Sequence, residues 1–295
     1  MNPYVQGQKT SGYSKVFKII LNRINHAIAC KNIKENQQLV IFSFDHIGLS
    51  LNLEGRYENS PLLLVEEFIE KKLANSRDKI ALDIGANIGN HSIFFAKKFK
   101  QVYAFEPNPI TFEVLKINSA YAAEHKNVIP VNFGLSDTED SLPFYINPSN
   151  IGGSGIIEGN NPHINDSIVI DVKTLDKFNE LKDVSVALIK IDVEGHELNV
   201  LKGAKATISR EMPAILFEQG AAEIIDGSSP VIEYLDEIGY EFYEIKKNFD
   251  FGDDLIAKIF SLACRSLFGE RLDFVKVKTF RKKFYDMILA MPKSL

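Results

Sequence analysis

Short apolar runs alternate with amphipathic stretches along most of this 295-residue chain. The apolar runs predict strands near 79–84, 101–106, 127–133, 186–191, 213–218, 240–245 and 284–290. Helical periodicity between these runs predicts helices near 89–98, 109–122, 196–208 and 229–238. This alternation predicts an α/β fold with a doubly wound, mostly parallel sheet. Because crossovers between parallel strands are right-handed, a site should lie in the loops at the carboxyl ends of the strands.

An extension over residues 1–59 precedes the α/β domain, which we place at 60–295. Residues 1–11 are polar and are expected to be disordered. A helix is predicted over 13–29, with an apolar stripe and interspersed lysines and an arginine. Such a stripe either binds a membrane surface or packs on its own domain, and we favour packing. Two apolar runs, Leu39–Phe44 and Leu49–Leu53, predict a β-hairpin.

Two insertions interrupt the α/β domain. The first, at 137–180, contains two apolar runs around the glycine loop Gly152–Gly155, which predicts a β-ribbon beside the site. The second, at 247–282, contains an amphipathic stretch from Asp254 to Leu267 and then a run of charges. We expect the charges to form a solvated face, the alternative being a substrate cap or partner-docking segment.

The composition narrows the functional classes. Lysine and arginine total 34 against 39 acidic residues, for a net charge of −5, which argues against a broad nucleic-acid-binding face. The N-terminus lacks the apolar core of a signal peptide, and no apolar run is long enough for a transmembrane helix. Cys30 and Cys264 have no metal-binding spacing, so we expect reduced cysteines in a cytoplasmic protein. None of these patterns sets an oligomeric state.

The segment Asp83-Ile-Gly-Ala-Asn-Ile-Gly89 joins a predicted buried strand to a helix through a glycine turn. Gly85 permits the turn and leaves room for a ligand, and Gly89 lets the helix begin close to it. Asn87 occupies the position of the second glycine in the dinucleotide motif, which disfavours a pyrophosphate. S-adenosylmethionine (SAM), an adenosine joined to a charged amino acid, fits better. Asp83 would hold its ammonium group, directly or through water.

Glu106 ends the next predicted strand, about 20 residues after the glycines, where a carboxylate meets ribose hydroxyls in a βαβ unit. A carboxylate at a strand end is also a common helix cap or a solvated loop residue. The combination of turn and carboxylate at this spacing indicates a nucleoside cofactor.

A second polar cluster follows the strand at 186–191, where Asp192, Glu194, His196 and Glu197 lie within six residues. Clustered charges at a strand end are candidates for shifted pKa values and catalysis. The alternative is a capping box in which Asp192 or Glu194 binds backbone N–H groups. A carboxylate or imidazole here would accept a proton. Asp192, Glu194 and Glu218 would alternatively supply oxygen ligands to a divalent cation.

These motifs, with Phe105-Glu-Pro-Asn108, Gly134-Leu-Ser-Asp137, Leu175-Asp176, Lys190-Ile-Asp-Val-Glu-Gly-His-Glu197 and Leu201-Lys-Gly-Ala204, resemble the FkbM family of SAM-dependent methyltransferases. The resemblance covers about 50–246 and resumes at 285–292. It implies the Rossmann-like class I methyltransferase fold, a seven-stranded sheet whose last strand is antiparallel. It also implies O-methylation, often of sugar hydroxyls on secondary metabolites or glycans. The extension and the 247–282 insertion depart from the family, which leaves the acceptor and any partner open.

The resemblance also implies roles for individual residues. Asp192 and Glu194 would face the methyl group and the acceptor as catalytic residues. His196 is a third catalytic candidate, the alternative being a packing or capping group at the start of the helix. The first six residues of the cofactor set belong to the glycine turn, Glu106 would bind the ribose, and Ser136 and Asp137 would border the adenine or form a plain turn. The implied cofactor residues are Asp83, Gly85, Ala86, Asn87, Gly89, Asn90, Glu106, Asn108, Ser136, Asp137 and Asp192.

The expected partner is a small-molecule or glycan acceptor, with no nucleic acid and no transmembrane segment, and with peripheral membrane contact open. An NAD-dependent oxidoreductase is the main alternative, and Asn87 speaks against it. A SAM-binding scaffold without catalysis would lack the acidic pair Asp192 and Glu194, which this chain has.

Overall fold

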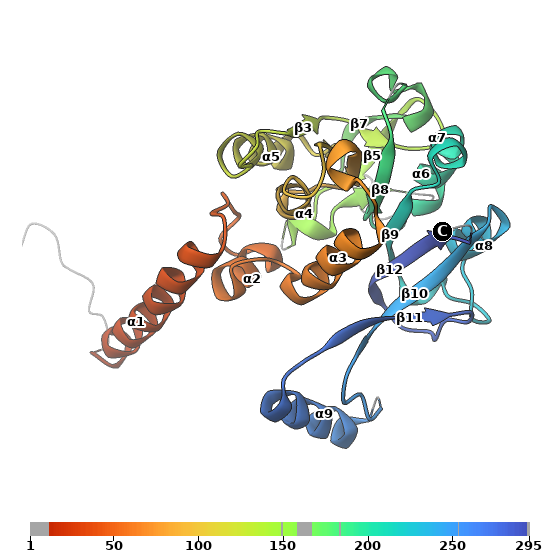
Figure 1. Ribbon diagram of the computed structural model, residues 1–295. Coiled ribbons are helices and arrows are strands. Elements are labelled where there is room, and N and C mark those ends of the chain that lie inside the picture. Colours follow the sequence, from red (N-terminus) through yellow and green to blue (C-terminus); the bar gives the residue numbers. More distant parts are fainter. Residues whose placement is uncertain (1–11, 149, 158–166, 183, 253, 294–295) are drawn as a thin grey trace, which may run out of the picture.

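An eight-stranded mixed sheet organises the chain in this computed structural model (Figure 1). The structure describes residues 12–148, 150–157, 167–182, 184–252 and 254–293. In spatial order the strands are β11 (Leu272–Val277), β10 (Tyr240–Lys247), β12 (Tyr285–Pro292), β9 (Ala214–Gln219), β8 (Val186–Ile191), β1 (Ile80–Ile84), β2 (Gln101–Phe105) and β3 (Val128–Val131). From β9 to β3 in this order, each strand is parallel to the next one. Strand β12 is antiparallel to both β9 and β10.

All seven strands predicted for the central sheet are present, and the last one is antiparallel, but the sheet has eight strands and not seven. The additional strand, β11, comes from the 247–282 insertion and pairs antiparallel with β10. Part of the charged run, expected as a solvated face, is therefore an edge strand. The predicted helix in the same insertion is confirmed as α9 (Leu255–Phe268).

Helices cover both faces of the sheet, which explains why every residue of β1 is buried. Ala81 belongs to an apolar cluster with α3 (Asn59–Lys72), α4 (Asn90–Phe95) and α5 (Pro109–Tyr121). Its neighbour Leu82 points to the other face, in a cluster with α6 (Glu197–Gly203), α7 (Lys205–Glu211) and α8 (Pro230–Glu237). The arrangement leaves the carboxyl edge of the parallel strands open for a site.

A second sheet forms from the 137–180 insertion and the residues just before it. Its strands, in spatial order, are β4 (Gly134–Leu135), β7 (Ser167–Lys173), β5 (Asp140–Tyr145) and β6 (Gly155–Ile156). The β5–β7 antiparallel pair confirms the predicted β-ribbon. The glycine loop spans the short 3₁₀ turn Ile151–Gly153 and the start of β6.

The N-terminal extension differs from the prediction in two respects. Its first helix, α1 (Gly12–Glu35), is longer than expected and projects from the rest of the chain (Figure 1). None of its residues is buried, so the expectation that its apolar stripe packs on its own domain is wrong. The expected disorder of 1–11 lies outside the described residues.

The predicted β-hairpin is also wrong, because the second of its two runs lies in a helix, α2 (His46–Glu54), and the first forms no strand. The alternation of Leu49, Leu51 and Leu53 imitates a strand, but only Leu51 of the three is buried. Gly55, at φ 78°, ends the helix, and its N–H donates to the Leu51 carbonyl. Among the described residues, no helix combines the length and the apolar character needed to cross a membrane.

Candidate functional site

A pocket lies at the carboxyl edge of the sheet, where the right-handed crossovers predict a site. The ends of β1, β2 and β8 supply its floor. The extension contributes His46, Ile47 and Tyr57, and the β-ribbon contributes a second wall that includes Ile151 and Gly152. The predicted cofactor residues that line it are Gly85, Ala86, Asn87, Asn90, Glu106, Asn108 and Asp192. The predicted catalytic residue Glu194 lines it as well.

The glycine turn is held by the strands on either side of β1. The N–H groups of Gly85 and Ala86 both donate to the Phe105 carbonyl of β2. Gly85 has φ +76°, and a Cβ there would lie 1.7 Å from the carbonyl oxygen of Asp192, after β8. The glycine is therefore required by the neighbouring backbone, and not by ligand space as the sequence suggested. This close approach brings the turn and Asp192 into one site.

Glu106 is buried beneath the turn and faces the pocket. Its carboxylate accepts hydrogen bonds from the N–H of Asn87 at 2.9 Å and from the N–H of Asn108 at 2.8 Å. Burial raises the pKa of Glu106 to about 7, although these two hydrogen bonds favour the ionised form. Asn108 caps α5, accepting from the Ile110 N–H. A ligand hydroxyl donating to Glu106 would further favour its ionised form.

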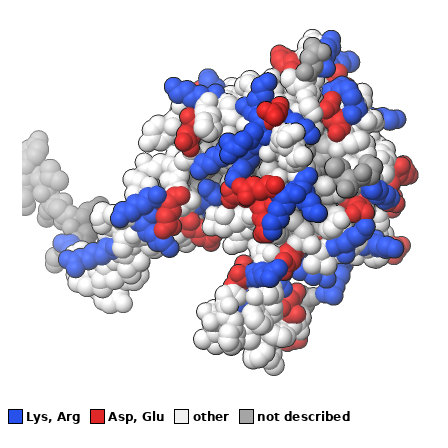
Figure 2. Space-filling model, in the orientation of Figure 1, with Lys and Arg blue, Asp and Glu red and all other residues white. Residues whose placement is uncertain are grey.

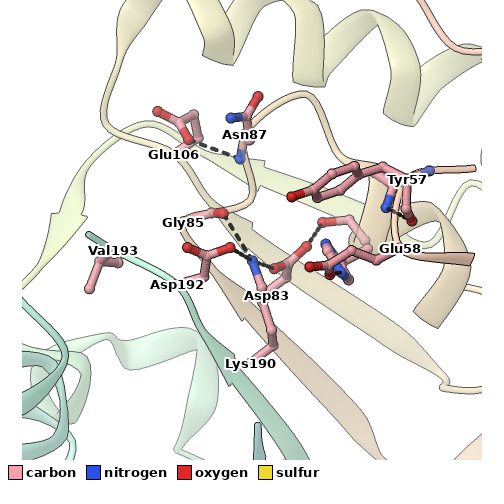
Figure 3. A network of polar contacts seen from close by, with 12 residues as sticks. Tyr57, Glu58, Asp83, Gly85, Asn87, Glu106, Lys190, Asp192 and Val193 are labelled. Atoms are coloured by element: carbon pink, nitrogen blue, oxygen red, sulfur yellow. Dashed lines mark hydrogen bonds and ion pairs between the residues drawn. The ribbon is translucent and has the colours of Figure 1, made fainter. Parts of the chain in front are cut away.

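Lys190 occupies the space between the carboxyl ends of β1 and β8 (Figure 3). Its buried ammonium donates to Asp192 Oδ2 at 2.9 Å and to the Gly85 carbonyl at 3.3 Å, and lies 3.6 Å from Asp83 Oδ1. Burial opposes the charge, but the two aspartates more than offset it and raise the pKa of Lys190. Asp83 also accepts from Ser92 Oγ at 2.5 Å and does not line the pocket.

Three carboxyl groups converge beside the turn. One oxygen from each of Asp192, Glu194 and Glu218 lies within 4.8 Å of the others, close enough to share a proton or a cation. Burial opposes the charge of Asp192, but Lys190 lowers its pKa below the ordinary value. Burial and repulsion from Asp192 raise the pKa of Glu194 to about 7 and that of Glu218 to about 9. At neutral pH the cluster therefore holds an ionised Asp192 and a protonated Glu218.

The turn after β8 places Glu194 at the pocket in a backbone conformation that side chains rarely adopt, with φ 55°. Glu197 stabilises the turn, because its carboxylate accepts from the N–H groups of Val193 and Gly195 at 3.2 Å each. The sequence had assigned such capping to Asp192 or Glu194 as the alternative to catalysis. Because Glu197 caps the turn, Asp192 and Glu194 are left facing the pocket.

Six of the predicted site residues do not line the pocket: Asp83, Gly89, Ser136, Asp137, His196 and Glu218. His196 is buried, with Nε2 2.9 Å from Ser136 Oγ and Nδ1 3.3 Å from the amide of Asn199. This arrangement joins the start of α6 to the loop after β4. Glu218 belongs to the carboxyl cluster but does not itself line the pocket.

Lys190 and Tyr57 are site residues to which the sequence analysis gave no role. Lys190 stood in a quoted motif, and a lysine within a buried strand was the available signal. Tyr57 lies in the extension and is tied to the turn by Asn90, whose side chain accepts from the Tyr57 N–H and donates to its carbonyl. Burial and nearby carboxylates, Glu58 first, raise the pKa of Tyr57, so its phenol stays protonated.

Comparison with protein families gives one match. The profile described as the Methyltransferase FkbM domain matches residues 83–281, which includes the glycine turn, Glu106 and the carboxyl cluster.

Individual relatives in sequence are also named as methyltransferases. The hexuronic acid methyltransferase AglP of Haloferax volcanii is 34% identical over 167 residues, covering 56% of this chain and 63% of that protein. Methyltransferase 1 of Beauveria bassiana is 30% identical over 181 residues, covering 50% of this chain and 70% of that protein. This chain thus spans less than two thirds of AglP. Among solved structures, Methyltransferase FkbM from Methylobacillus flagellatus KT is similar, with 18% identity, a TM-score of 0.42 and coverage of 82% of this chain and 52% of that one.

Replacing Lys190 by methionine should strongly destabilise the fold. The substitution leaves Asp83 buried with no cation beside it, and removing one partner of a buried ion pair costs about 3–5 kcal/mol. Urea denaturation measures the loss in the free energy of unfolding. Adding Asp83→Asn should recover part of it.

Lys116→Met is the matched control, because Lys116 pairs with Glu113 on the surface. Such a pair contributes about 0–1 kcal/mol. If Lys190→Met and Lys116→Met unfold at the same urea concentration, the buried cation does not hold the strand ends together.

Proposed function

This chain belongs to the FkbM methyltransferase domain family, and from that premise we propose that it transfers the methyl group of SAM to an oxygen of a sugar-containing acceptor. The observation that carries the proposal is the juxtaposition, in one pocket, of the glycine turn and Glu106 with Asp192 and Glu194, of which Glu194 has a raised pKa. The glycine turn with Glu106 suits a nucleoside cofactor, and the carboxyl groups suit proton transfer. The relatives reported above are methyltransferases and give no support to an NAD-dependent oxidoreductase.

The cofactor half would use Glu106 for the ribose hydroxyls. Its two oxygens each accept one backbone hydrogen bond, which fixes the carboxylate and leaves further lone pairs for a diol. Asn108 and the backbone around Ala86 and Asn87 would border the nucleoside and the methionine part. Asp83 would act indirectly, by holding Lys190 and Ser92 beneath the turn.

The acceptor half would use Glu194 as the base. A sulfonium methyl group is already electrophilic, so the protein must align the acceptor oxygen with the S–CH₃ bond at roughly 3 Å. The O–CH₃ bond then forms as the S–CH₃ bond breaks, leaving neutral S-adenosylhomocysteine. The hydroxyl proton passes to the Glu194 carboxylate. Asp192 is committed to Lys190 and Glu218 is protonated, so Glu194 is the carboxyl group best suited to take a proton near neutral pH.

The acceptor itself is proposed from the walls and their charge. A hexuronic acid, the sugar in the name of AglP, offers both hydroxyls and a carboxylate. The ionised Asp192 and the adjacent Glu194 would repel an acceptor carboxylate, and a carboxylate needs no base. We therefore favour methylation of a neutral sugar hydroxyl. The Tyr57 phenol would donate a hydrogen bond to the sugar from the opposite wall.

Glu106→Ala should weaken S-adenosylhomocysteine binding by about one to two orders of magnitude. The loss corresponds to a charge-assisted hydrogen bond of about 1.5–3 kcal/mol. Titration calorimetry measures it, with Glu113→Ala on the exposed side of α5 as the control that keeps wild-type affinity. Equal affinities for the wild type and Glu106→Ala would remove Glu106 from the cofactor site.

Glu194→Gln should lower kcat by roughly 10²–10⁴ while leaving S-adenosylhomocysteine affinity within a few-fold, because it removes a base and no cofactor contact. In the wild type, turnover should fall as the pH drops through about 7, where Glu194 becomes protonated. The fold should survive, since ionising Glu194 is unfavourable in the native state. Wild-type turnover by Glu194→Gln would exclude it as the base, and activity lost to chelation and restored by Mg²⁺ would assign the cluster to a metal instead.

The acceptor class is tested with isotopically labelled SAM and a panel of aryl glycosides that includes a glucoside and a glucuronide. A methyl ether survives mild alkali, whereas a methyl ester is cleaved. We expect alkali-stable label on the sugar. Alkali-labile label on the glucuronide alone would show that the acceptor is the carboxylate.

A further inference from the structure

Two helices stand away from the α/β body (Figure 1), and both expose apolar side chains. One is α1 in the extension, and the other is α9 in the 247–282 insertion. Helix α1 lies outside the residues that the family profile matches, whereas α9 lies within them. Neither supplies a residue to the pocket, so the proposed methyl transfer does not account for them.

Most of the exposed apolar residues of α1 form one stripe, and Ile19 and Ile33 lie outside it. The stripe residues at 13, 16, 17, 20, 21 and 24 follow the i, i+3, i+4, i+7 spacing of a single helical face. Tyr13 is 85% exposed and Ile20 52%. The C-terminal part of the helix meets α2, where the Asn32 side chain donates to the Asn52 carbonyl.

Helix α9 exposes a second apolar face. One side packs on the loop that precedes the helix and carries polar groups, since Ser261 Oγ accepts from the Phe251 N–H and Arg265 donates to the Phe249 carbonyl. The opposite side is apolar, with Ile256 80% and Leu267 78% exposed. Figure 2 shows the protruding α9 as a largely uncharged surface below the charged body. A helix that packs on its own core turns its apolar face inward, whereas α9 turns its apolar face to the solvent.

The charged residues near these apolar faces indicate which kind of surface would bind them. Helix α1 carries five basic residues (Lys15, Lys18, Arg23, Lys31 and Lys34) and one acidic residue, Glu35, whereas the whole chain has a net charge of −5. On α9 the exposed Lys258 borders the apolar face and no acidic residue lies within the helix, although Asp254 caps its first turn and Arg265, on the polar side, pairs with Glu270. Apolar faces bordered by lysine and arginine match an interface of acyl chains and anionic headgroups.

We propose that α1 and α9 dock the chain on the surface of an anionic lipid bilayer. Each helix lies in the interface, with its apolar face among the acyl chains and its basic residues at the headgroups. The two helices act together, so that each supplies part of the affinity and neither suffices for stable docking alone.

Co-sedimentation with lipid vesicles tests the proposal on the full chain. Wild type should sediment with vesicles of mixed phosphatidylcholine and phosphatidylglycerol, and much less with phosphatidylcholine alone or at high salt. Ile20→Glu and Ile256→Glu should each lower the bound-to-free ratio roughly tenfold or more. Val169→Glu is the matched control, because Val169 is 72% exposed on β7 of the body, and it should bind like wild type.

Replacing Lys15, Lys18 and Arg23 together by glutamine should lower binding to the anionic vesicles and leave the weak binding to phosphatidylcholine unchanged. S-adenosylhomocysteine affinity equal to wild type shows that each variant is folded. Wild type that binds neither vesicle, or variants that bind as well as wild type, would overturn the proposal. So would a wild-type dimer in sedimentation equilibrium that Ile20→Glu or Ile256→Glu dissociates, since a second copy would then cover these faces.

Discussion

The site depends on one buried cation. Asp83 of β1 lies opposite Lys190 of β8 in the parallel register, and Asp192 follows two residues later on the same edge. Without the ammonium group, the carboxylates of Asp83 and Asp192 would lie close together in space at the ends of two neighbouring strands, with no cation between them. An uncompensated buried charge costs several kcal/mol. Lys190 pairs with both carboxylates, and its third contact, to the Gly85 carbonyl, fixes the turn above them. The same group therefore holds the strands, the turn and the acidic cluster in one arrangement.

The charge of Lys190 also distributes the protons of the site. It keeps Asp192 ionised, and the ionised Asp192 then raises the pKa values of Glu194 and Glu218. Three carboxyl groups of the same chemistry thus differ in protonation at neutral pH, because only one of them touches the cation. A base near neutral pH follows from this asymmetry and not from any property of glutamate alone.

The sequence was sufficient for what depends on local pattern. Apolar runs located the strands, the glycine spacing located the turn, and Glu106 and Glu194 were assigned to the edge on which the structure places them. The failures have a common physical origin in contacts between distant segments. Leu49, Leu51 and Leu53 alternate as in a strand, and only the packing of α2 reveals which of them is buried. Strand β11 forms because β10 offers it an edge.

Site residues were missed for the same reason. Tyr57 reaches the pocket through Asn90, which lies 33 positions away in the sequence, and no spacing rule links the two. His196 looked catalytic beside Glu194, yet the turn at Gly195 sends the imidazole to Ser136 and away from the pocket wall. Adjacent residues at a tight turn point in different directions, so their proximity in sequence does not place them in one site.

The most direct test of the account is a crystal structure with S-adenosylhomocysteine bound. The account predicts both ribose hydroxyls on the Glu106 carboxylate and the sulfur facing the Asp192–Glu194 turn, with open space for an acceptor oxygen between the sulfur and Glu194. A ligand whose ribose makes no contact with Glu106, or whose sulfur points away from the carboxyl cluster, would contradict it.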